Sequence, residues 1–219
     1  MERSLKTTED GSHTMFVKEL DEPYHSSHGA LQESMHVFIK QGLLTMKQSS
    51  VRILELGFGT GLNALLTLRE SIPKNLEVYY HAVEKYPLKD SEYTQLNYEK
   101  VIQHLPKGAL HRMHSCPWGE AIQISNRFTL YKEDADFRSM KLPPNINLIY
   151  FDAFAPDKQP DLWTDKVIGT IGKVCEHGAI LVTYSSKGVV RRTLTSCGFD
   201  VHKVSGPPGK REMIRAIKR

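Results

Sequence analysis

The pattern of apolar positions changes along the chain between two periods, which predicts alternating strands and helices. Short runs rich in β-branched and aromatic residues end at glycine, proline or acidic residues, and most are separated by apolar residues at helical spacing. The first 28 residues are polar and irregular, with at most a short hairpin around residues 15–20. Strands are predicted over residues 51–56, 77–84, 127–132, 146–151, 179–184, 199–204 and 212–217, and helices over 29–46, 62–72, 88–105, 165–174 and 187–196.

This alternation predicts an α/β fold, with a doubly wound, Rossmann-like and mainly parallel sheet of seven strands. We expect residues 49–219 to form that domain. Residues 1–48 are expected to form a small N-terminal extension whose helix closes over the site. Ligands of such sheets bind outside the carboxyl ends of the strands. The first four predicted strands all end in carboxylates, which points to a site at that edge: Glu55, Glu84, Asp134 and Asp152.

A glycine turn follows the first strand, in the sequence VRILELGFGTGLN of residues 51–63. Glu55 precedes Gly57, Gly59 and Gly61, and glycine allows a ligand to approach the backbone closely. The spacing fits neither a P-loop nor a dinucleotide fingerprint, and a carboxylate at the turn would repel a pyrophosphate. The E-x-G-x-G-x-G form resembles motif I of class I methyltransferases, whose ligand, S-adenosylmethionine, has a sulfonium, an ammonium and a ribose diol. A turn without a ligand is the alternative.

Two of the strand-end acids are candidates for holding a nucleoside. Glu84 lies 23 residues beyond Gly61, where an acid in nucleotide-binding sheets accepts hydrogen bonds from ribose hydroxyls. Asp134 is placed to accept from the adenine amine, with the backbone amide of Ala135 facing the ring. The alternatives are a strand-end carboxylate in water for Glu84 and a helix N-cap for Asp134.

Asp152 opens the segment DAFAPDKQPDLWT directly after a fully apolar strand. A carboxylate there is costly unless it is paired or functional. We predict that Asp152 orients an acceptor amine and takes its proton as a general base, because an ammonium has no lone pair for methyl transfer. Phe154 and Pro156 are predicted to hold a flat ring, by stacking in the case of Phe154. A loop turn built from Asp and Pro is the alternative.

Signals elsewhere are weaker. Tyr24, Gly29 and Glu33 lie in EPYHSSHGALQES before the first strand, where Glu33 has the alternative role of a first-turn carboxylate. Trp163 is a candidate substrate residue, and the alternative is a core aromatic residue.

Composition limits the class of protein. The 219 residues are 40% hydrophobic and have no apolar run long enough to span a membrane. The N-terminus has no signal-peptide core, and the three cysteines and ten histidines have no metal-binding spacing, so we expect a cytoplasmic protein without a metal. The last 34 residues hold nine basic and two acidic side chains, a charge of +7, whereas the whole chain carries +4. A one-sided basic region suits a phosphate backbone, although an ordinary solvated surface is the alternative.

With these residues in place, the chain resembles the tRNA 5-methylaminomethyl-2-thiouridine methyltransferase family. Its members are MnmD-type proteins, equivalent to the methyltransferase half of bifunctional MnmC. The resemblance extends over nearly the whole chain. The blocks that carry it are YHSSHGALQES, ELGFGTGLN, VEKYPL, FDAFAPDKQPDLWT, SSKGVVRRTL and GKREM.

The resemblance implies methyl transfer from S-adenosylmethionine to the aminomethyl nitrogen at C5 of the wobble uridine, in the anticodon loop of tRNA. The residues it places around the cofactor are Gly57, Gly59, Gly61, Asn63, Glu84, Lys85, Asp134, Ala135 and Asp152, with Tyr24, Gly29 and Glu33 closing over it. On the acceptor and tRNA side it places Asp152, Phe154, Pro156, Trp163, Arg191, Arg192, Lys210 and Arg211.

Bifunctional members also carry an FAD oxidase half, for which this sequence has no second glycine fingerprint. We therefore expect a separate oxidase or upstream tRNA-modifying enzymes to supply the aminomethyl substrate. Two alternatives remain: an aminopropyltransferase acting on a small amine, and a module that binds cofactor or RNA without catalysis.

Overall fold

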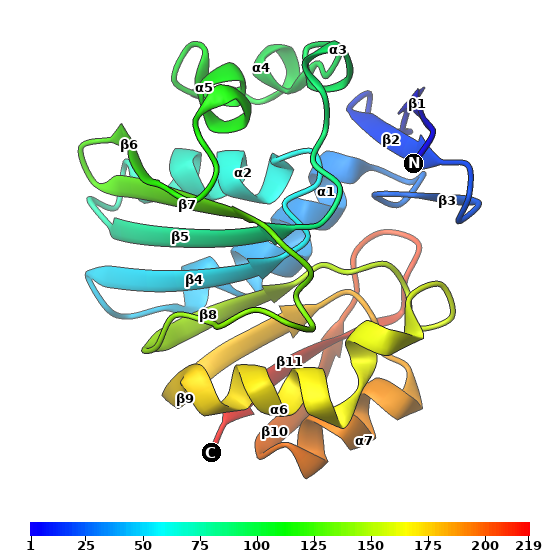
Figure 1. The fold of residues 1–219 in the computed structure, drawn as a ribbon, viewed down its shortest axis with the longest axis vertical. Helices are drawn as coiled ribbons and strands as arrows, with labels where there is room; N and C mark the ends of the chain where they lie inside the picture. Colours follow the sequence, from blue (N-terminus) through cyan, green and yellow to red (C-terminus); the bar gives the residue numbers. More distant parts are fainter.

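Eight strands form the central sheet of the computed structural model, which describes residues 1–219 (Figure 1). Their order is β10-β11-β9-β8-β4-β5-β7-β6, and the five central strands from β9 to β7 run parallel. All seven predicted strands are present, and β6 is an additional antiparallel edge strand. The strands are β4 (Ser50–Leu56), β5 (Glu77–Glu84), β6 (Ala121–Ser125), β7 (Phe128–Asp134), β8 (Ile146–Phe151), β9 (Cys175–Thr183), β10 (Phe199–Ser205) and β11 (Glu212–Lys218).

Helices cover both faces of this sheet because successive strand residues point to opposite sides. In β4, Val51 and Ile53 join the core beneath helix α2, whereas Leu54 and Leu56 join the core beneath α6 and α7. The helices are α1 (Ala30–Ser34), the π-helix η1 (Met35–Lys40), the 3-10 turns η2 (Leu43–Thr45) and η3 (Pro160–Trp163), α2 (Leu62–Ser71), α3 (Asp90–Tyr93), α4 (Tyr98–Val101), α5 (Ala109–Ser115), α6 (Asp165–Val174) and α7 (Gly188–Ser196).

The continuous helix predicted over residues 88–105 is wrong. Two short helices, α3 and α4, stand there, and the chain between them passes through Asn97. The Asn97 side chain accepts a hydrogen bond from the His13 amide at 2.9 Å and donates one to the Gly11 carbonyl at 2.8 Å. These contacts with the N-terminal segment compete with helix formation, as asparagine side chains commonly do.

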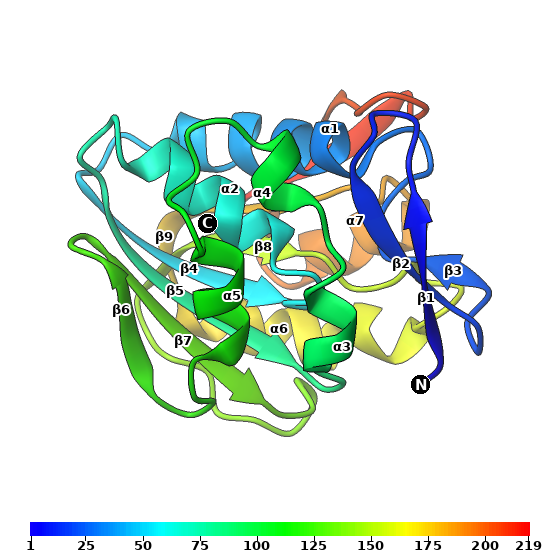
Figure 2. The ribbon, with the colours of Figure 1, turned by 90° about the horizontal axis from the view of Figure 1, so that it is seen from above.

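A separate three-stranded antiparallel sheet precedes the main sheet, where at most one hairpin was expected. It comprises β1 (Arg3–Thr7), β2 (His13–Val17) and β3 (Glu22–Pro23). Figure 2 shows this sheet standing at one end of the molecule, beside the ends of the central strands. Helices α1 and η1, in contrast, pack on the main sheet with α2, since Val37, Phe38 and Ile39 belong to the same core as Leu65.

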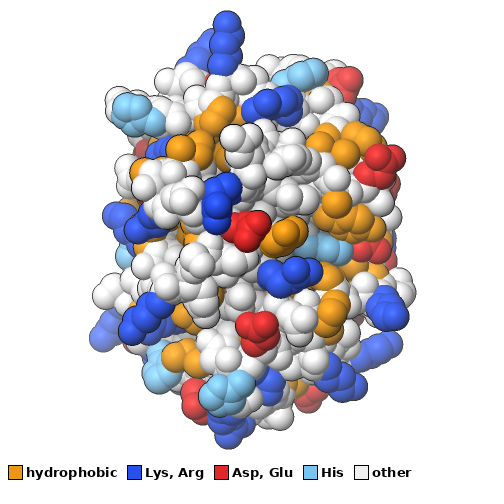
Figure 3. Space-filling view, turned by 90° about the vertical axis from the view of Figure 1, so that its left-hand side faces the viewer, with side chains coloured by type: hydrophobic (Ala, Val, Ile, Leu, Met, Phe, Trp, Pro, Cys, Tyr) orange, Lys and Arg blue, Asp and Glu red, His pale blue; other side chains and the backbone are white.

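Figure 3 shows the side of the molecule that faces left in Figure 1, away from the N-terminal sheet. On it, Lys and Arg side chains are spread among Asp and Glu, with apolar side chains scattered between them. Charge is therefore not gathered into one patch on that side. No helix of the structure has the length and apolarity needed to cross a bilayer.

Candidate active site

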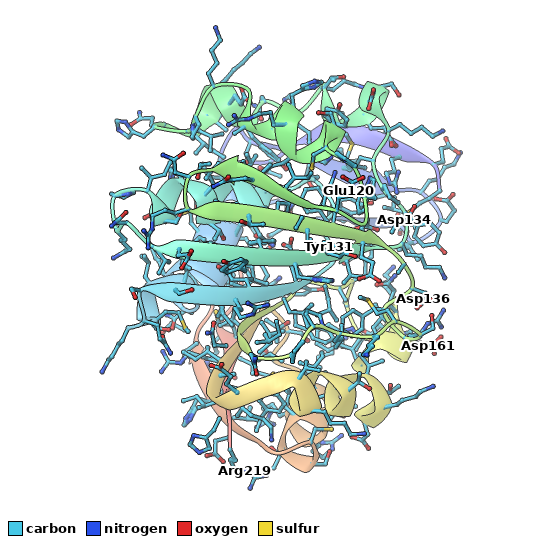
Figure 4. The ribbon with its side chains drawn as sticks, turned by 60° about the vertical axis from the view of Figure 1, so that its left-hand side comes forward. Glu120, Tyr131, Asp134, Asp136, Asp161 and Arg219 are labelled. Atoms are coloured by element: carbon cyan, nitrogen blue, oxygen red, sulfur yellow. The ribbon has the colours of Figure 1, made fainter.

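A cavity of about 570 Å³ opens where the central strands end, as the fold class predicts. Its wall combines the N-terminal segment 22–28, the glycine turn, the ends of β5 and β8, the loop 152–162 and the loop between β10 and β11. This volume is typical of a site for a cofactor-sized ligand. In Figure 4, Asp134, Asp136 and Asp161 lie along this edge.

The glycine turn is held against the end of β5. The Gly59 amide donates to one carboxylate oxygen of Glu84 at 2.9 Å, and the Tyr86 amide donates to the other at 2.8 Å. Gly57 has φ 90°, and a Cβ there would come within 2.9 Å of the Asp152 carbonyl oxygen. Three of the predicted cofactor residues, Gly57, Gly59 and Glu84, line the cavity.

Gly61 does not line the cavity. A Cβ on it would meet the rings of Phe58 and His114, each at 3.1 Å, so this glycine permits close packing beneath the turn. Gly29 also lies outside the cavity, and a Cβ on it would come within 2.5 Å of an Asp10 carboxylate oxygen.

Glu55 was expected at the mouth of the turn, but it is buried within the sheet with 1% exposure. Its Oε1 accepts a hydrogen bond from Asn63 Nδ2 at 2.9 Å, and the Tyr80 hydroxyl is another polar neighbour. Burial, to which the charge on Asp152 adds, raises the pKa of Glu55 well above its usual value. Burial thus favours the protonated form of this side chain, which does not line the cavity.

Asp152 follows β8 and lines the cavity. Burial, together with the charge of Glu33, raises the pKa of this carboxyl to about 7, although the hydrogen bond from Asn63 Nδ2 at 2.8 Å and the Lys210 charge oppose the change. A carboxyl with this pKa exchanges a proton near neutrality, as a general base must.

Aromatic rings form part of the cavity wall. Tyr24 and Phe154 lie with ring centres 5.3 Å apart, and both line the cavity. Trp163 does not line it: this residue is 4% exposed, packs on Phe151 and donates from Nε1 to the Phe154 carbonyl at 2.9 Å. Trp163 is thus the core residue of the alternative interpretation.

Pro156 is buried in the loop and does not line the cavity. The rings of Phe154 and Tyr24 occupy the wall, and the predicted contact of Pro156 with a flat ring stays a prediction.

Glu33 and Lys210 both line the cavity and form an ion pair of 2.6 Å. The other Glu33 oxygen accepts from the Ser26 amide at 2.8 Å. Lys210 was predicted to contact tRNA phosphate, but its ammonium is engaged by this carboxylate and by the Tyr184 ring, whose centre lies 4.0 Å away.

Asp134 is exposed at the end of β7 and does not line the cavity, and its predicted contact with adenine stays a prediction. The neighbouring Ala135 and Asp136 do line it. The predicted cofactor residue Lys85 also lines the cavity and pairs with Asp136 at 3.0 Å. Hydrogen bonds from Arg138 and Lys85 keep the pKa of Asp136 well below its usual value.

The basic C-terminal region is partly neutralised. Lys187 pairs with Asp157, Lys203 with Glu212, and Arg219 with Asp200. Three arginines are exposed and have no ion pair: Arg191, Arg192 and Arg211.

Tyr184, His25 and Lys158 also line the cavity and were not predicted. Tyr184 directly follows β9 and donates to the Ala153 carbonyl at 2.9 Å. Since it ends a predicted strand, the signal that identified the carboxylates would have found it too. Lys158 donates to the Leu20 carbonyl at 2.8 Å, a contact between distant loops that no local pattern indicates.

Comparison with known proteins identifies the class. A model of the S-adenosyl-L-methionine-dependent methyltransferase family matches residues 93–219. The tRNA 5-methylaminomethyl-2-thiouridine biosynthesis bifunctional protein MnmC of Marinomonas sp. (strain MWYL1) is 31% identical over 96% of the chain and 33% of its own length. Its namesake from Vibrio cholerae serotype O1 (strain M66-2) is 32% identical over 90% of the chain and 32% of its own length.

Solved structures agree. The crystal structure of MnmC2 from Aquifex aeolicus is 29% identical with a TM-score of 0.81, covering 98% of this chain and 69% of that one. Spermidine synthase from Thermotoga maritima, 10% identical with a TM-score of 0.54 over 100% of this chain and 72% of its own, shares only the fold. The protein belongs to the S-adenosyl-L-methionine-dependent methyltransferase family. S-adenosylmethionine is its cofactor, and the chain spans about a third of the length of the curated relatives it matches.

Proposed function

We propose that the protein methylates the 5-aminomethyl nitrogen of the wobble uridine in tRNA, converting aminomethyl-(2-thio)uridine to methylaminomethyl-(2-thio)uridine. The proposal takes the substrate class from the names of the MnmC relatives and the chemistry from Asp152. The observation that carries it is a carboxyl of pKa about 7 in the wall of the cofactor cavity. Such a group promotes transfer to an amine, because an ammonium must lose a proton before its nitrogen has a lone pair for attack.

In this proposal, Glu84 accepts the ribose hydroxyls and the backbone of Gly57 and Gly59 lets the cofactor approach. Asn63, Lys85, Ala135 and Tyr24 complete the cofactor wall, since each lines the cavity. The donor set fits the cofactor: carboxylates suit its ammonium and hydroxyls, and Gly57 leaves no room for a side chain. When bound, S-adenosylmethionine supplies an activated methyl group.

The residues of the chain then have two tasks. Asp152 orients the acceptor amine and removes its proton, so that the lone pair attacks in line with the methyl–sulfur bond. Phe154 and Tyr24 hold the base of the acceptor nucleotide through their rings. Because the methyl group is already activated, positioning provides most of the acceleration.

An aminopropyltransferase acting on a free polyamine is disfavoured by Lys210. A polyamine carries several positive charges and needs carboxylates around it, whereas Glu33 on this wall is neutralised by the Lys210 ammonium at 2.6 Å. Of the two carboxyl groups on the proposed acceptor side, Glu33 and Asp152, only Asp152 has no ion pair.

The tRNA backbone is proposed to lie across α7 and the β10–β11 loop. Arg191, Arg192 and Arg211 are exposed there without ion pairs, and guanidinium groups bind phosphate well. Residues 1–48 are proposed to close over the bound cofactor, since residues 22–28 and Glu33 already form part of the wall. A separate oxidase or an upstream tRNA-modifying enzyme is proposed to supply the aminomethyl group.

The test is incubation of the purified protein with methyl-labelled S-adenosylmethionine and tRNA from cells that cannot complete this methylation, followed by nucleoside analysis. Label in 5-methylaminomethyl-(2-thio)uridine is the expected result. Label on a free polyamine or on no acceptor, with the cofactor still bound, would contradict the proposed substrate.

A further inference from the structure

The amide group of Asn63 bridges two carboxyl groups behind the cavity. Its Nδ2 donates to Asp152 Oδ2 at 2.8 Å and to Glu55 Oε1 at 2.9 Å, which uses both of its hydrogens. Asn63 stands in the first turn of α2, directly after the glycine turn, and is 3% exposed. The same turn that approaches the cofactor therefore also places this amide.

Glu55 holds Asn63 from the buried side. Its polar neighbours are both neutral, the Asn63 amide and the Tyr80 hydroxyl, and no cation pairs with it. An ionised carboxylate with so little compensation would be very costly inside the sheet. Glu55 is therefore a neutral acid in the folded protein, in accord with the raised pKa of this group.

We propose that Asn63 is a positioning residue for Asp152 and that Glu55 fixes the Asn63 amide without adding charge beside the base. This inference rests on the proposed role of Asp152 in taking a proton. Asn63 holds Oδ2 of that carboxyl group, while Oδ1 accepts no hydrogen bond from the protein and is left for the acceptor amine. The amide donor also favours the ionised form of Asp152, in opposition to burial.

The test is a direct titration of the Asp152 carboxyl carbon by NMR, in protein labelled with ¹³C-aspartate, with the resonance assigned from its absence in Asp152→Asn. In Asn63→Leu the Asp152 pKa should rise by about one unit, because a donor to the ionised form is lost. Turnover at pH 7 should fall about tenfold or more. In Glu55→Gln the Asp152 pKa should not move, because glutamine reproduces a neutral acid.

Ser71→Ala is the control on the same helix, since Ser71 is buried two turns away and donates only to the Leu68 carbonyl. It should leave both the pKa of Asp152 and turnover unchanged. Asn63→Ser is a milder second variant, in case the leucine prevents folding, and should shift the pKa in the same direction.

An unchanged Asp152 pKa in both Asn63 variants would overturn the inference. So would a fall of more than about half a unit in Glu55→Gln, because that fall would mean that Glu55 carries a charge. The titration needs no acceptor. The expected shifts in a protein that methylates no tRNA would therefore support the positioning role while contradicting the proposed substrate.

Discussion

The Lys210 ammonium lies 2.6 Å from a carboxylate oxygen of Glu33, although the two residues are 177 positions apart in the sequence. The pair joins the loop between β10 and β11 to helix α1 across one wall of the cavity. Glu33 is 5% exposed, so its negative charge is stabilised by this partner and by the Ser26 amide rather than by water. Lys210 is thus part of the cavity wall.

Removal of the Lys210 ammonium should destabilise the fold. In Lys210→Met, Glu33 remains buried without its cation, and the free energy of unfolding measured in urea should fall by about 2 kcal/mol. Lys203→Met is the matched control in the same hairpin, because its pair with Glu212 is more exposed and should contribute less than about 1 kcal/mol. Equal losses in the two variants would show that the Glu33 pair is an ordinary surface contact.

Loss of the proposed base should separate binding from turnover. Asp152→Asn keeps the shape of the side chain, so S-adenosylhomocysteine should bind within about threefold of wild type in calorimetry, whereas turnover should fall about 100-fold or more. Asp134→Asn should leave both quantities near wild type, because Asp134 lies outside the cavity. Near-normal turnover of Asp152→Asn would remove Asp152 from the mechanism.

The rate should depend on pH through Asp152, whose pKa is about 7 in the folded protein. Only the ionised carboxylate accepts a proton, so kcat should rise through pH 7 and level off above it, with about a tenth of the sites ionised at pH 6. A flat rate between pH 6 and pH 8 would be inconsistent with this assignment.

The same group should make stability depend on pH. The folded state holds the Asp152 proton more tightly than the unfolded chain does, so the contribution of this group to stability falls as pH rises from about 4 to about 7. Asp152→Asn should therefore gain stability over wild type as pH increases across this window, measured by urea unfolding at several pH values. A gain that does not grow with pH would argue against the raised pKa.

The exposed arginines of α7 should determine the salt dependence of tRNA use. Arg191→Gln with Arg192→Gln should raise the apparent KM for tRNA and reduce the slope of log KM against log salt by about one to two. Lys47→Gln with Lys74→Gln removes the same charge from loops at the opposite edge of the sheet and should have little effect. Equal effects of the two pairs would mean that only overall charge matters.

Gly57 should tolerate no side chain. A Cβ there would lie 2.9 Å from the Asp152 carbonyl at φ 90°, whereas Gly119 has φ 78° and open space around it. Both Gly57→Ala and Gly119→Ala carry the cost of positive φ, about 1 kcal/mol, but only the first should also weaken binding of S-adenosylhomocysteine in calorimetry. Equal affinities would show that the turn can move away from β8.

Much of the fold and part of the site could be predicted from local patterns. Strand periodicity and strand-end carboxylates led to Glu84 and Asp152, because the carboxyl ends of parallel strands meet at one edge. The same reasoning gave no means of telling a carboxylate held by backbone amides from a free one. Glu84 receives two amide hydrogen bonds, whereas Asp134, its partner across the strands, receives none and points into solvent.

Contacts between distant segments explain the remaining differences. The side chain of Asn97 bonds to the N-terminal sheet and ends the predicted helix, and Trp163 turns inward to the carbonyl of Phe154. Lys210 was predicted to lie beside tRNA phosphate or the acceptor loop. It lines the cavity, and because its partner Glu33 lies on another element, neither local sequence indicates the pairing.

Both chain ends are described by the structure, and they differ in what can be attached to them. Met1 lines the cavity and its amino group lies 3.6 Å from a Glu19 oxygen, whereas Arg219 lies at the far end of the molecule in Figure 1. A purification tag joined at Met1 would begin in the wall of the cofactor site and would compete with the acceptor for space. Assays of this protein are therefore best made with the tag at Arg219, or with an N-terminal tag removed.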